Sequence, residues 1–369
     1  MSKAIKFSTY VAIGITSLIL FAACSADDDG TALPDGKYPM TFTTQVEGLT
    51  ATRAATANGE WTTTDRIAVK VSNDGVKQYA PASGGSASAT LSGVDADNTF
   101  YWQTSNETKT VTAWYCGNGS TASGQTNAGA VPASWAVQAD QSGMSSPDGY
   151  QQSDFLYAPA TDIAFNNRST QSLNFYHQTA KVIINIKNEE ASTDAGKIQS
   201  VVIGHANNLS LSGAYTAPTS GSTAGTWDIA SSSKGTITTK KLTNPNQISD
   251  SETALASYTA LVIPQDMKDK KFIAITLSNG GGRDTYYYTP TQDNDANLQS
   301  GKQHTFDITV KHGYLEVSVS ISAQWTGGSE DVPGNAQTVT PGTDGSGSGW
   351  RQDSDGDVSV SGTDKSNNP

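Results

Sequence analysis

Cysteine is nearly absent from this sequence, since its 369 residues contain only Cys24 and Cys116. Zinc fingers and zinc ribbons need four clustered Cys or His ligands, so both are excluded. If the Cys24 sulfur is acylated when the N-terminus is processed, Cys116 has no second cysteine to pair with, and we expect no intrachain disulfide. Cys116 follows the apolar run 111–115 and is expected to be a small buried side chain.

Motifs for catalysis and for cofactor or metal binding are also lacking. None of the four histidines belongs to an H-E-x-x-H pair, and no nucleophile elbow, P-loop or dinucleotide fingerprint occurs. His177 and His304 flank strand-like runs and are expected to be hydrogen-bonded structural residues. Asp353–Asp357 resembles the start of a calcium loop, but Val358 and Asp364 stand where that loop needs Gly and Glu. We therefore predict no enzyme, no cofactor and no metal site.

Basic residues are few, with 23 Lys and Arg against 35 Asp and Glu and a formal net charge of −12. This balance repels phosphate backbones, so nucleic acid is not an expected partner.

Helical periodicity is missing as well, because no window of ten residues repeats apolar side chains at i, i+3 and i+4. Short alternating runs such as Val182, Ile184 and Ile186 recur instead, separated by turn residues. The pattern predicts an all-β protein built of sandwiches or barrels.

The spacing of these runs predicts two antiparallel β-sandwich domains in tandem. A polar, proline-containing stretch separates an N-terminal sandwich at 37–165 from a C-terminal sandwich at 166–328. Residues 329–369 form a Gly/Ser/Asp-rich tail with too few apolar residues to order itself, and we expect it to be flexible. Within it only 336–339 and 358–360 alternate like strands, and these would add to another sheet.

The N-terminus predicts a lipoprotein signal peptide, residues 1–23. Lys3 and Lys6 precede an uncharged run that ends in Phe21-Ala22-Ala23-Cys24, which resembles a bacterial lipobox with Phe in place of the usual Leu. Cleavage between Ala23 and Cys24 would leave diacylglycerol on the Cys24 sulfur, and several acyl chains anchor a protein stably. A membrane-spanning helix is the alternative, but the run is at the short limit of about 17 residues. The acidic linker 24–36 resembles a Bacteroidetes surface-export signal.

Two strand-like runs near the N-terminus enclose a loop with a single charge. In the first run, Met40, Phe42, Thr44 and Val46 share one face of an extended chain, and Ile67–Val71 alternates again. The loop between them is small, polar and bounded by glycine, and its one charged residue before Glu60 is Arg53. A trypsin-like protease is expected to cut there, leaving Ala54 as a new N-terminus. The first strand would then be removable.

The chain resembles the Bacteroidetes fimbrillins, the Mfa-like type V pilins. The residues that carry the resemblance are, in order, the lipobox, Thr52-Arg53, Trp61, Asp65–Val69, Phe100–Trp102, Asp140–Ser142, Ser153–Tyr157, Tyr176–Val182, Leu298–Phe306 and Ile321–Trp325. The resemblance implies two transthyretin-like β-sandwich domains and export as a lipoprotein. It also implies that an arginine-specific protease removes the first strand and that a neighbouring subunit's strand replaces it. Arg53 matches the cleavage position.

The resemblance implies a structural subunit of a type V fimbria, at the outer membrane and cell surface. Its expected partners are other fimbrial subunits, with the outer membrane as anchor before maturation and a host or bacterial surface ligand as a further candidate. A tip adhesin or a glycan- or protein-binding surface lipoprotein of the same fold is the alternative, and stalk, tip and anchor roles all stay open. Six tryptophans offer sugar-stacking surfaces, but core packing is the preferred interpretation. They are Trp61, Trp102, Trp114, Trp135, Trp227 and Trp325.

Overall fold

Strands account for most of the structure. The computed structural model describes residues 32–34, 38–47, 49–50, 60–117, 130–143, 148–188, 198–219, 221–242, 254–279, 282–311, 314–322, 325–326, 337–339, 351–352 and 358–361. Within these ranges the α-helices are α1 Gly149–Gln152 and α2 Asp293–Ala296, each of four residues. The all-β prediction is confirmed. No helix of the described residues is both long and apolar enough to cross a membrane.

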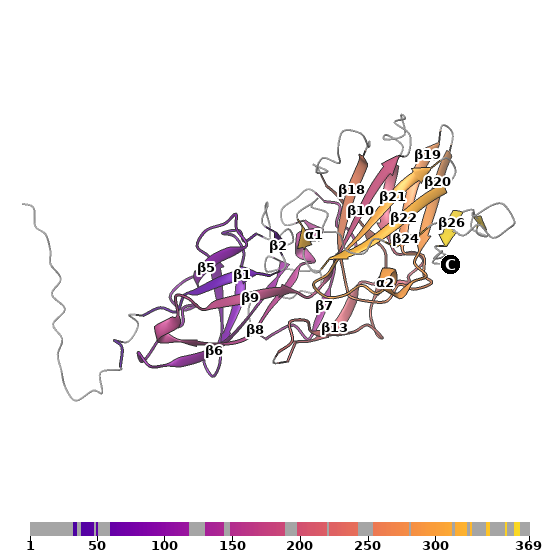
Figure 1. Cartoon of the computed structure of the whole chain (residues 1–369). Coiled ribbons are helices and arrows are strands. Elements are labelled where there is room, and N and C mark those ends of the chain that lie inside the picture. The colour runs from indigo at the N-terminus through magenta and orange to yellow at the C-terminus, as the bar shows by residue number, and fades with distance from the viewer. Residues whose placement is uncertain are drawn as a thin grey trace, which may run out of the picture.

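Seven strands of the N-terminal half close into a barrel in the order β1-β5-β4-β3-β6-β8-β9 (Figure 1). They are β1 Phe42–Val46, β3 Ile67–Val71, β4 Gly75–Pro81, β5 Ser88–Gly93, β6 Thr108–Cys116, β8 Phe155–Ala164 and β9 Ser172–His177. Alternating apolar residues of these strands point inward and pack around buried aromatic rings such as Trp61, Tyr79 and Phe175. Burial of this shared face is what holds the barrel together.

Two six-stranded sheets form the second half. One has the order β17-β18-β10-β21-β22-β24 and the other β16-β11-β19-β20-β26-β25. Their strands are β10 Ala180–Asn188, β11 Ile198–Ile203, β16 Ile237–Thr238, β17 Lys240–Lys241, β18 Ala254–Val262, β19 Ile273–Asn279, β20 Gly282–Thr289, β21 Gln303–Lys311, β22 Tyr314–Ser322, β24 Gln337–Val339, β25 Arg351–Gln352 and β26 Val358–Ser361. The sheets share one core, in which Phe306 of one sheet contacts Phe272 and Tyr288 beside the other at 5.4 and 5.8 Å between ring centroids.

Three small sheets join segments that are distant in sequence. β7 Ser134–Ala136 and β14 Thr226–Asp228 flank β13 Ser212–Thr216. β12 Leu209–Ser210 pairs with β15 Lys234–Gly235, and β2 Leu49–Thr50 pairs in parallel with β23 Trp325–Thr326. Because β7 lies between two barrel strands in sequence, the β7–β13 pairing ties the barrel to the second half.

The structure corrects the predicted antiparallel sandwich of the N-terminal half, because β1 is parallel to β9 and closes a barrel. In the second half β10 is likewise parallel to β21. Alternation in a sequence shows which face of a strand is buried, but it carries no information on the direction of its neighbours. β9 also pairs with β8, so it belongs to the barrel, whereas the sequence assigns residues from 166 onward to the second domain.

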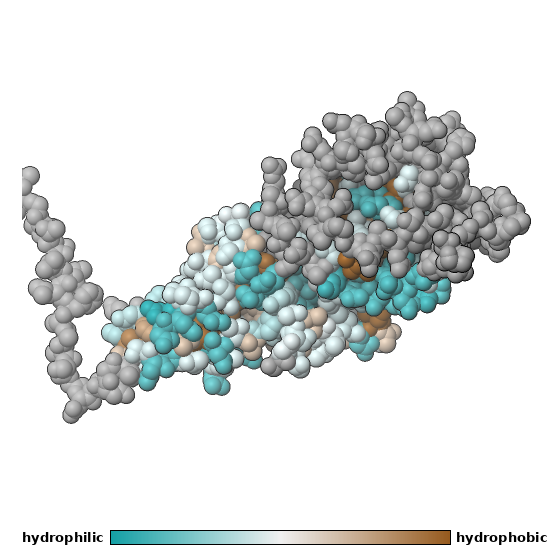
Figure 2. All heavy atoms as spheres, in the orientation of Figure 1, coloured by the Kyte–Doolittle hydropathy of each residue, from teal (hydrophilic) through white to brown (hydrophobic). Residues whose placement is uncertain are grey.

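On the face shown in Figure 2, pale and teal residues dominate the coloured surface. Among the described residues Tyr38 is the one large apolar side chain classed as exposed, with 37% of its surface accessible. Cys116 is fully buried, as the sequence predicts. Most of the large apolar side chains of this part of the chain are therefore buried.

Candidate functional site

Strand β1 lies between two neighbours and completes the barrel. It pairs antiparallel with β5, from Phe42 opposite Leu91 to Gln45 opposite Ser88, and parallel with β9, from Thr43 opposite Ser172 to Val46 opposite Phe175. Both of its edges are therefore hydrogen-bonded. Taking β1 away would leave the facing edges of β5 and β9 without a partner, which is the arrangement that accepts an added strand.

The four residues predicted on the inner face of β1 and just before it are all buried. Met40, Thr44 and Val46 are 0% exposed and Phe42 is 1% exposed. Phe42 packs against Tyr79 with ring centroids 5.3 Å apart, and the Tyr79 hydroxyl donates to the Met40 carbonyl at 3.2 Å. The buried Thr44 hydroxyl donates to the Ala89 carbonyl at 3.0 Å, so its polar atom is satisfied.

The chain on both sides of β1 is also bonded to the barrel. Before β1, the Leu33 amide donates to the Gln103 carbonyl at 2.8 Å, and after it the Glu47 amide donates to the Phe175 carbonyl at 2.8 Å. β2 then pairs with β23. The predicted processing residues Ala23, Cys24, Arg53 and Ala54 lie outside the described residues. By sequence position alone, a cut after Arg53 separates β1 and β2 from β3 and all later strands.

A buried group of polar and charged side chains lies where β2 meets the second half. The Trp325 indole stacks on the His177 ring, with centroids 3.4 Å apart, and His177 Nδ1 lies 2.9 Å from Asp154 Oδ1. His177 is thus hydrogen-bonded, as predicted, and it is also buried. Lys181 is 2% exposed, its Nζ lies 5.6 Å from the Trp325 ring centroid, and burial lowers its pKa to about 8. No local sequence pattern brings Asp154, His177 and Trp325 together, because they come from segments far apart in the chain.

Asp65 is a second buried carboxyl group, 2% exposed, at the start of β3. Burial raises the pKa of Asp65 to about 6, although hydrogen bonds from the Thr62 amide at 2.6 Å and the Tyr115 hydroxyl at 3.1 Å oppose the rise. A pKa above the unfolded value of about 3.9 means that the folded state holds the proton more tightly. This carboxyl therefore reduces stability progressively as the pH rises from about 4 through 6.

Replacing Asp65 by Asn is expected to remove this pH dependence. Two pKa units correspond to roughly 3 kcal/mol, so the stability of Asp65→Asn relative to the parent protein should increase by as much as about 3 kcal/mol between pH 4 and pH 7. The asparagine oxygen still accepts the Thr62 amide. Urea denaturation at both pH values measures the difference. Parallel pH profiles for the two proteins would contradict the assigned pKa.

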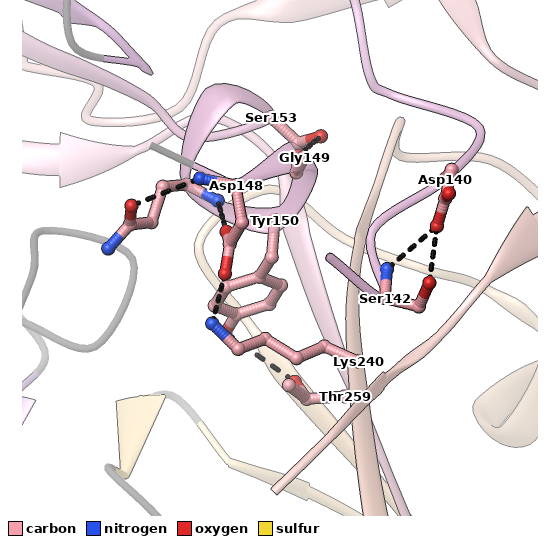
Figure 3. A network of polar contacts seen from close by, with 9 residues as sticks. Asp140, Ser142, Asp148, Gly149, Tyr150, Ser153, Lys240 and Thr259 are labelled. Carbon is pink, nitrogen blue, oxygen red and sulfur yellow. Dashed lines mark hydrogen bonds and ion pairs between the residues drawn. The ribbon is translucent and has the colours of Figure 1, made fainter. Parts of the chain in front are cut away.

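An ion pair links helix α1 to the second half (Figure 3). Asp148 caps α1 by accepting from the Gln151 amide at 2.8 Å, and its other oxygen pairs with Lys240. Tyr150, fully buried beneath the pair, faces Thr259 with 3.5 Å between their hydroxyl oxygens. A Cβ on Gly149 would lie 1.9 Å from the Asp140 carbonyl oxygen, so the turn accepts only glycine there. The network fixes α1 against β17 and β18.

Replacing Lys240 by Met is expected to cost about 2 kcal/mol of unfolding free energy. The substitution leaves the Asp148 carboxylate, 5% exposed, without its charged partner, and hydrogen bonds to charged groups are worth about 1.5–3 kcal/mol. The control is Lys241→Met at the exposed neighbouring position, which should change stability by less than about 0.5 kcal/mol. Chemical denaturation checks both, and equal losses would mean that the ion pair contributes nothing.

Comparison with known proteins agrees with this architecture. A candidate cell adhesion protein of Bacteroides uniformis superposes with a TM-score of 0.53 at 16% identity, covering 79% of this chain and 99% of that one. A second, from Bacteroides ovatus, gives 0.52 at 18% identity with the same coverage. The tip fimbrial protein Mfa3 of Porphyromonas gingivalis matches at 0.41 and 10% identity, covering 77% of this chain and 99% of its own. At these identities the first two matches show a shared fold.

No curated protein sequence matches the chain. The model of the fimbrillin-like family does, over residues 52–325. The match begins just after β2 and ends at Trp325, so it takes in β3 to β22 and covers well over half of the chain. The chain therefore belongs to the fimbrillin-like family.

Proposed function

We propose that the protein is a structural subunit of a type V fimbria that polymerises by donor-strand exchange. The observation that supports this most directly is β1, which lies between β5 and β9 and buries Met40, Phe42, Thr44 and Val46. Its only covalent link to the rest of the barrel passes through the stretch that contains Arg53. Cleavage after Arg53 would open a groove with two unpaired edges, and the strand of a neighbouring subunit would fill it.

The C-terminal tail supplies the candidate donor. β24 pairs with β22 as an edge strand, and β26 lies between β20 and the outermost strand β25, so the described tail strands extend the two sheets of the chain's own second half. β26 lies at the end of the molecule away from β1 (Figure 1). A tail at that end is placed to reach the open barrel of the next subunit in a head-to-tail series. Such heterologous contacts build filaments when the series does not close.

Lipidation of Cys24 and cleavage after Ala23 would bring this subunit to the outer membrane and then to the cell surface. The barrel and the sandwich are then its two domains, which we relate to the transthyretin-like pair of the fimbrillins. Its partners are other fimbrial subunits. A tip adhesin is the second candidate, favoured by an open cleft between the two halves that Tyr176 and Trp227 line.

Limited proteolysis tests the proposal. An arginine-specific protease should cut after Arg53 first, giving Ala54 as the new N-terminus and sodium dodecyl sulfate-resistant ladders on unheated gels. Arg66 is restrained by bonds to two backbone carbonyls, and Arg168 stacks over Phe165 at 3.8 Å, so cuts there should be slower. The control is Arg53→Ala, which should stay monomeric under the same treatment. Ladders from Arg53→Ala, or cleavage without any ladder in the parent protein, would refute the stalk role.

A further inference from the structure

A cleft of about 780 Å³ opens between the barrel and the second half. Tyr176 at the end of the barrel forms one side, and the loops 223–227 and 297–302 form the other. This volume is within the usual range for small-molecule sites, which often lie where two structural units meet. Neither β1 pairing nor the tail strands occupy it. Of its lining residues only Glu47, directly after β1, belongs to the segment before Arg53, so the cleft is largely separate from the strand groove.

Gln178, which is fully buried in the connection between the two halves, holds one wall of the cleft in place. Its side-chain nitrogen donates to the Tyr176 and Thr223 carbonyls at 2.9 and 3.0 Å, and its side-chain oxygen accepts from the Gly225 amide at 2.8 Å. A Cβ on Gly225 would lie 2.5 Å from the Tyr215 ring, so the loop passes too close for any other residue. The wall is thus formed before any ligand arrives, which lowers the entropy cost of binding.

Trp227 is fixed in the same wall. Its indole nitrogen donates to the Gln178 carbonyl and to the Ser300 hydroxyl, both at 3.1 Å, and its ring packs on Tyr215 with centroids 5.0 Å apart. Unlike the five fully buried tryptophans, it keeps part of its surface open. A partly exposed ring whose indole nitrogen is already hydrogen-bonded can offer apolar surface to a ligand. Tyr176, also half-buried, offers a second ring.

The remaining lining carries many uncharged hydrogen-bonding groups. The exposed amides of Asn297 and Gln299 lie on one loop, and the Thr223 and Thr226 hydroxyls lie on another. Amides offer donors and acceptors together, which suits hydroxyl groups. Apart from His177, the charged lining residues are Glu47 and Lys302, whose opposite charges cancel. The described residues contain no group of three His, Cys, Asp or Glu that could hold a metal ion.

We propose that this cleft binds a neutral saccharide, with its sugar rings against Tyr176 and Trp227 and its hydroxyls bonded to Asn297 and Gln299. A phosphate or sulfate ligand would need excess positive charge, which the lining lacks. A lipid chain would leave the amides of Asn297 and Gln299 without hydrogen-bond partners, and a peptide strand would need an unpaired sheet edge. Only a ligand that combines apolar ring faces with many hydroxyls matches all of these groups. The inference concerns the uncleaved chain and stands whether or not the chain polymerises.

Binding to an array of neutral, sialylated and sulfated oligosaccharides tests the proposal, with the neutral ligand of highest signal then titrated by calorimetry. The variant Asn297→Ala/Gln299→Ala should lose at least tenfold in affinity. The matched control is Asn294→Ala/Gln103→Ala, which removes one exposed amide of each kind outside the cleft and should stay within twofold. Tyr176→Phe should retain binding and Tyr176→Ala should lose it, because the ring matters more than the hydroxyl.

Thermal unfolding of every variant separates loss of binding from loss of fold. Affinity should change by less than twofold between 50 and 500 mM salt, about the range in which charge pairing is screened. Failure of all neutral saccharides to bind the parent protein would overturn the inference. So would binding restricted to sialylated or sulfated saccharides, or equal affinity in the two double variants. None of these results bears on donor-strand exchange, which the proteolysis experiment decides separately.

Discussion

A chain that begins at Ala54 is expected to lose its stable monomeric state. The three apolar side chains of Met40, Phe42 and Val46 are completely or almost completely buried, at roughly 1.5–3 kcal/mol each. The ladders to β5 and β9 add hydrogen bonds at about 1 kcal/mol each. Together they reach on the order of 10 kcal/mol, which is comparable with the whole stability of an ordinary domain.

A peptide of residues 38–50 should restore the monomer when it is added to the truncated chain. The measurement is the urea midpoint from tryptophan fluorescence, together with size-exclusion chromatography, over a titration of the peptide. Substituting Phe42 and Val46 by Asp in the peptide should abolish rescue, because both side chains enter the barrel core. The control substitutes Thr43 and Gln45, the half-buried positions of the opposite face, and should still rescue.

Equal rescue by the two substituted peptides would contradict the burial pattern of β1. A truncated chain as stable and monomeric as the full one would contradict the larger claim that β1 completes the barrel. Ladders that form without the peptide and disappear when it is added would support donor-strand exchange directly, since the peptide and the donor would then compete for the same groove. The experiment therefore tests the packing of β1 in the barrel separately from polymerisation by donor-strand exchange.

The local properties of β1 could be predicted from the sequence, but its neighbours could not. Alternation at Met40, Phe42, Thr44 and Val46 follows from burial of one face, and the structure confirms that burial. The parallel pairing with β9 joins residues more than a hundred positions apart, and no local pattern encodes it. For this reason the sequence predicted a sandwich where the structure has a barrel.

The contacts of the buried groups at the junction of the barrel and the second half could not be predicted from the sequence either. Five of the tryptophans assigned to the core are fully buried, whereas Trp227 is partly exposed and lines the cleft. Its partner Gln178 is an ordinary polar residue in the sequence, although it was part of the family resemblance. The ion pair between Asp148 and Lys240 spans 92 positions. Chemistry that depends on such distant contacts appears only when the strands are placed in space.

The tail strand that is expected to donate is β26 rather than β24. Val358 and Val360 are two residues apart, so they share one face of an extended chain, as Thr44 and Val46 do in β1. Two apolar positions with this spacing can replace the inward residues of β1. In β24, the sequence Gln337-Thr338-Val339 offers only one apolar side chain. The pairing of β24 with β22 would then hold the beginning of the tail against the second half of the chain.

Substituting Val358 and Val360 by Asp is therefore expected to abolish the ladders that form after cleavage at Arg53. Two charged side chains cannot enter the apolar barrel, and each buried unpaired carboxylate costs several kcal/mol. The control is Ser359→Asp/Ser361→Asp, which alters the same strand on its other face and should leave the ladders within about twofold of the parent intensity. Unheated gels and electron microscopy of the cleaved proteins measure the outcome.

Truncation after Glu330 should abolish the ladders as well while leaving the uncleaved chain folded, because β24 and β26 add only to sheet edges. Strong ladders from the truncated chain would show that the tail is not the donor. Ladders lost equally in the valine and serine variants would mean that the tail acts through its charge or flexibility instead of through an inserted strand. Only selective loss in the valine variant identifies β26, in its expected register, as the strand that replaces β1 of the next subunit.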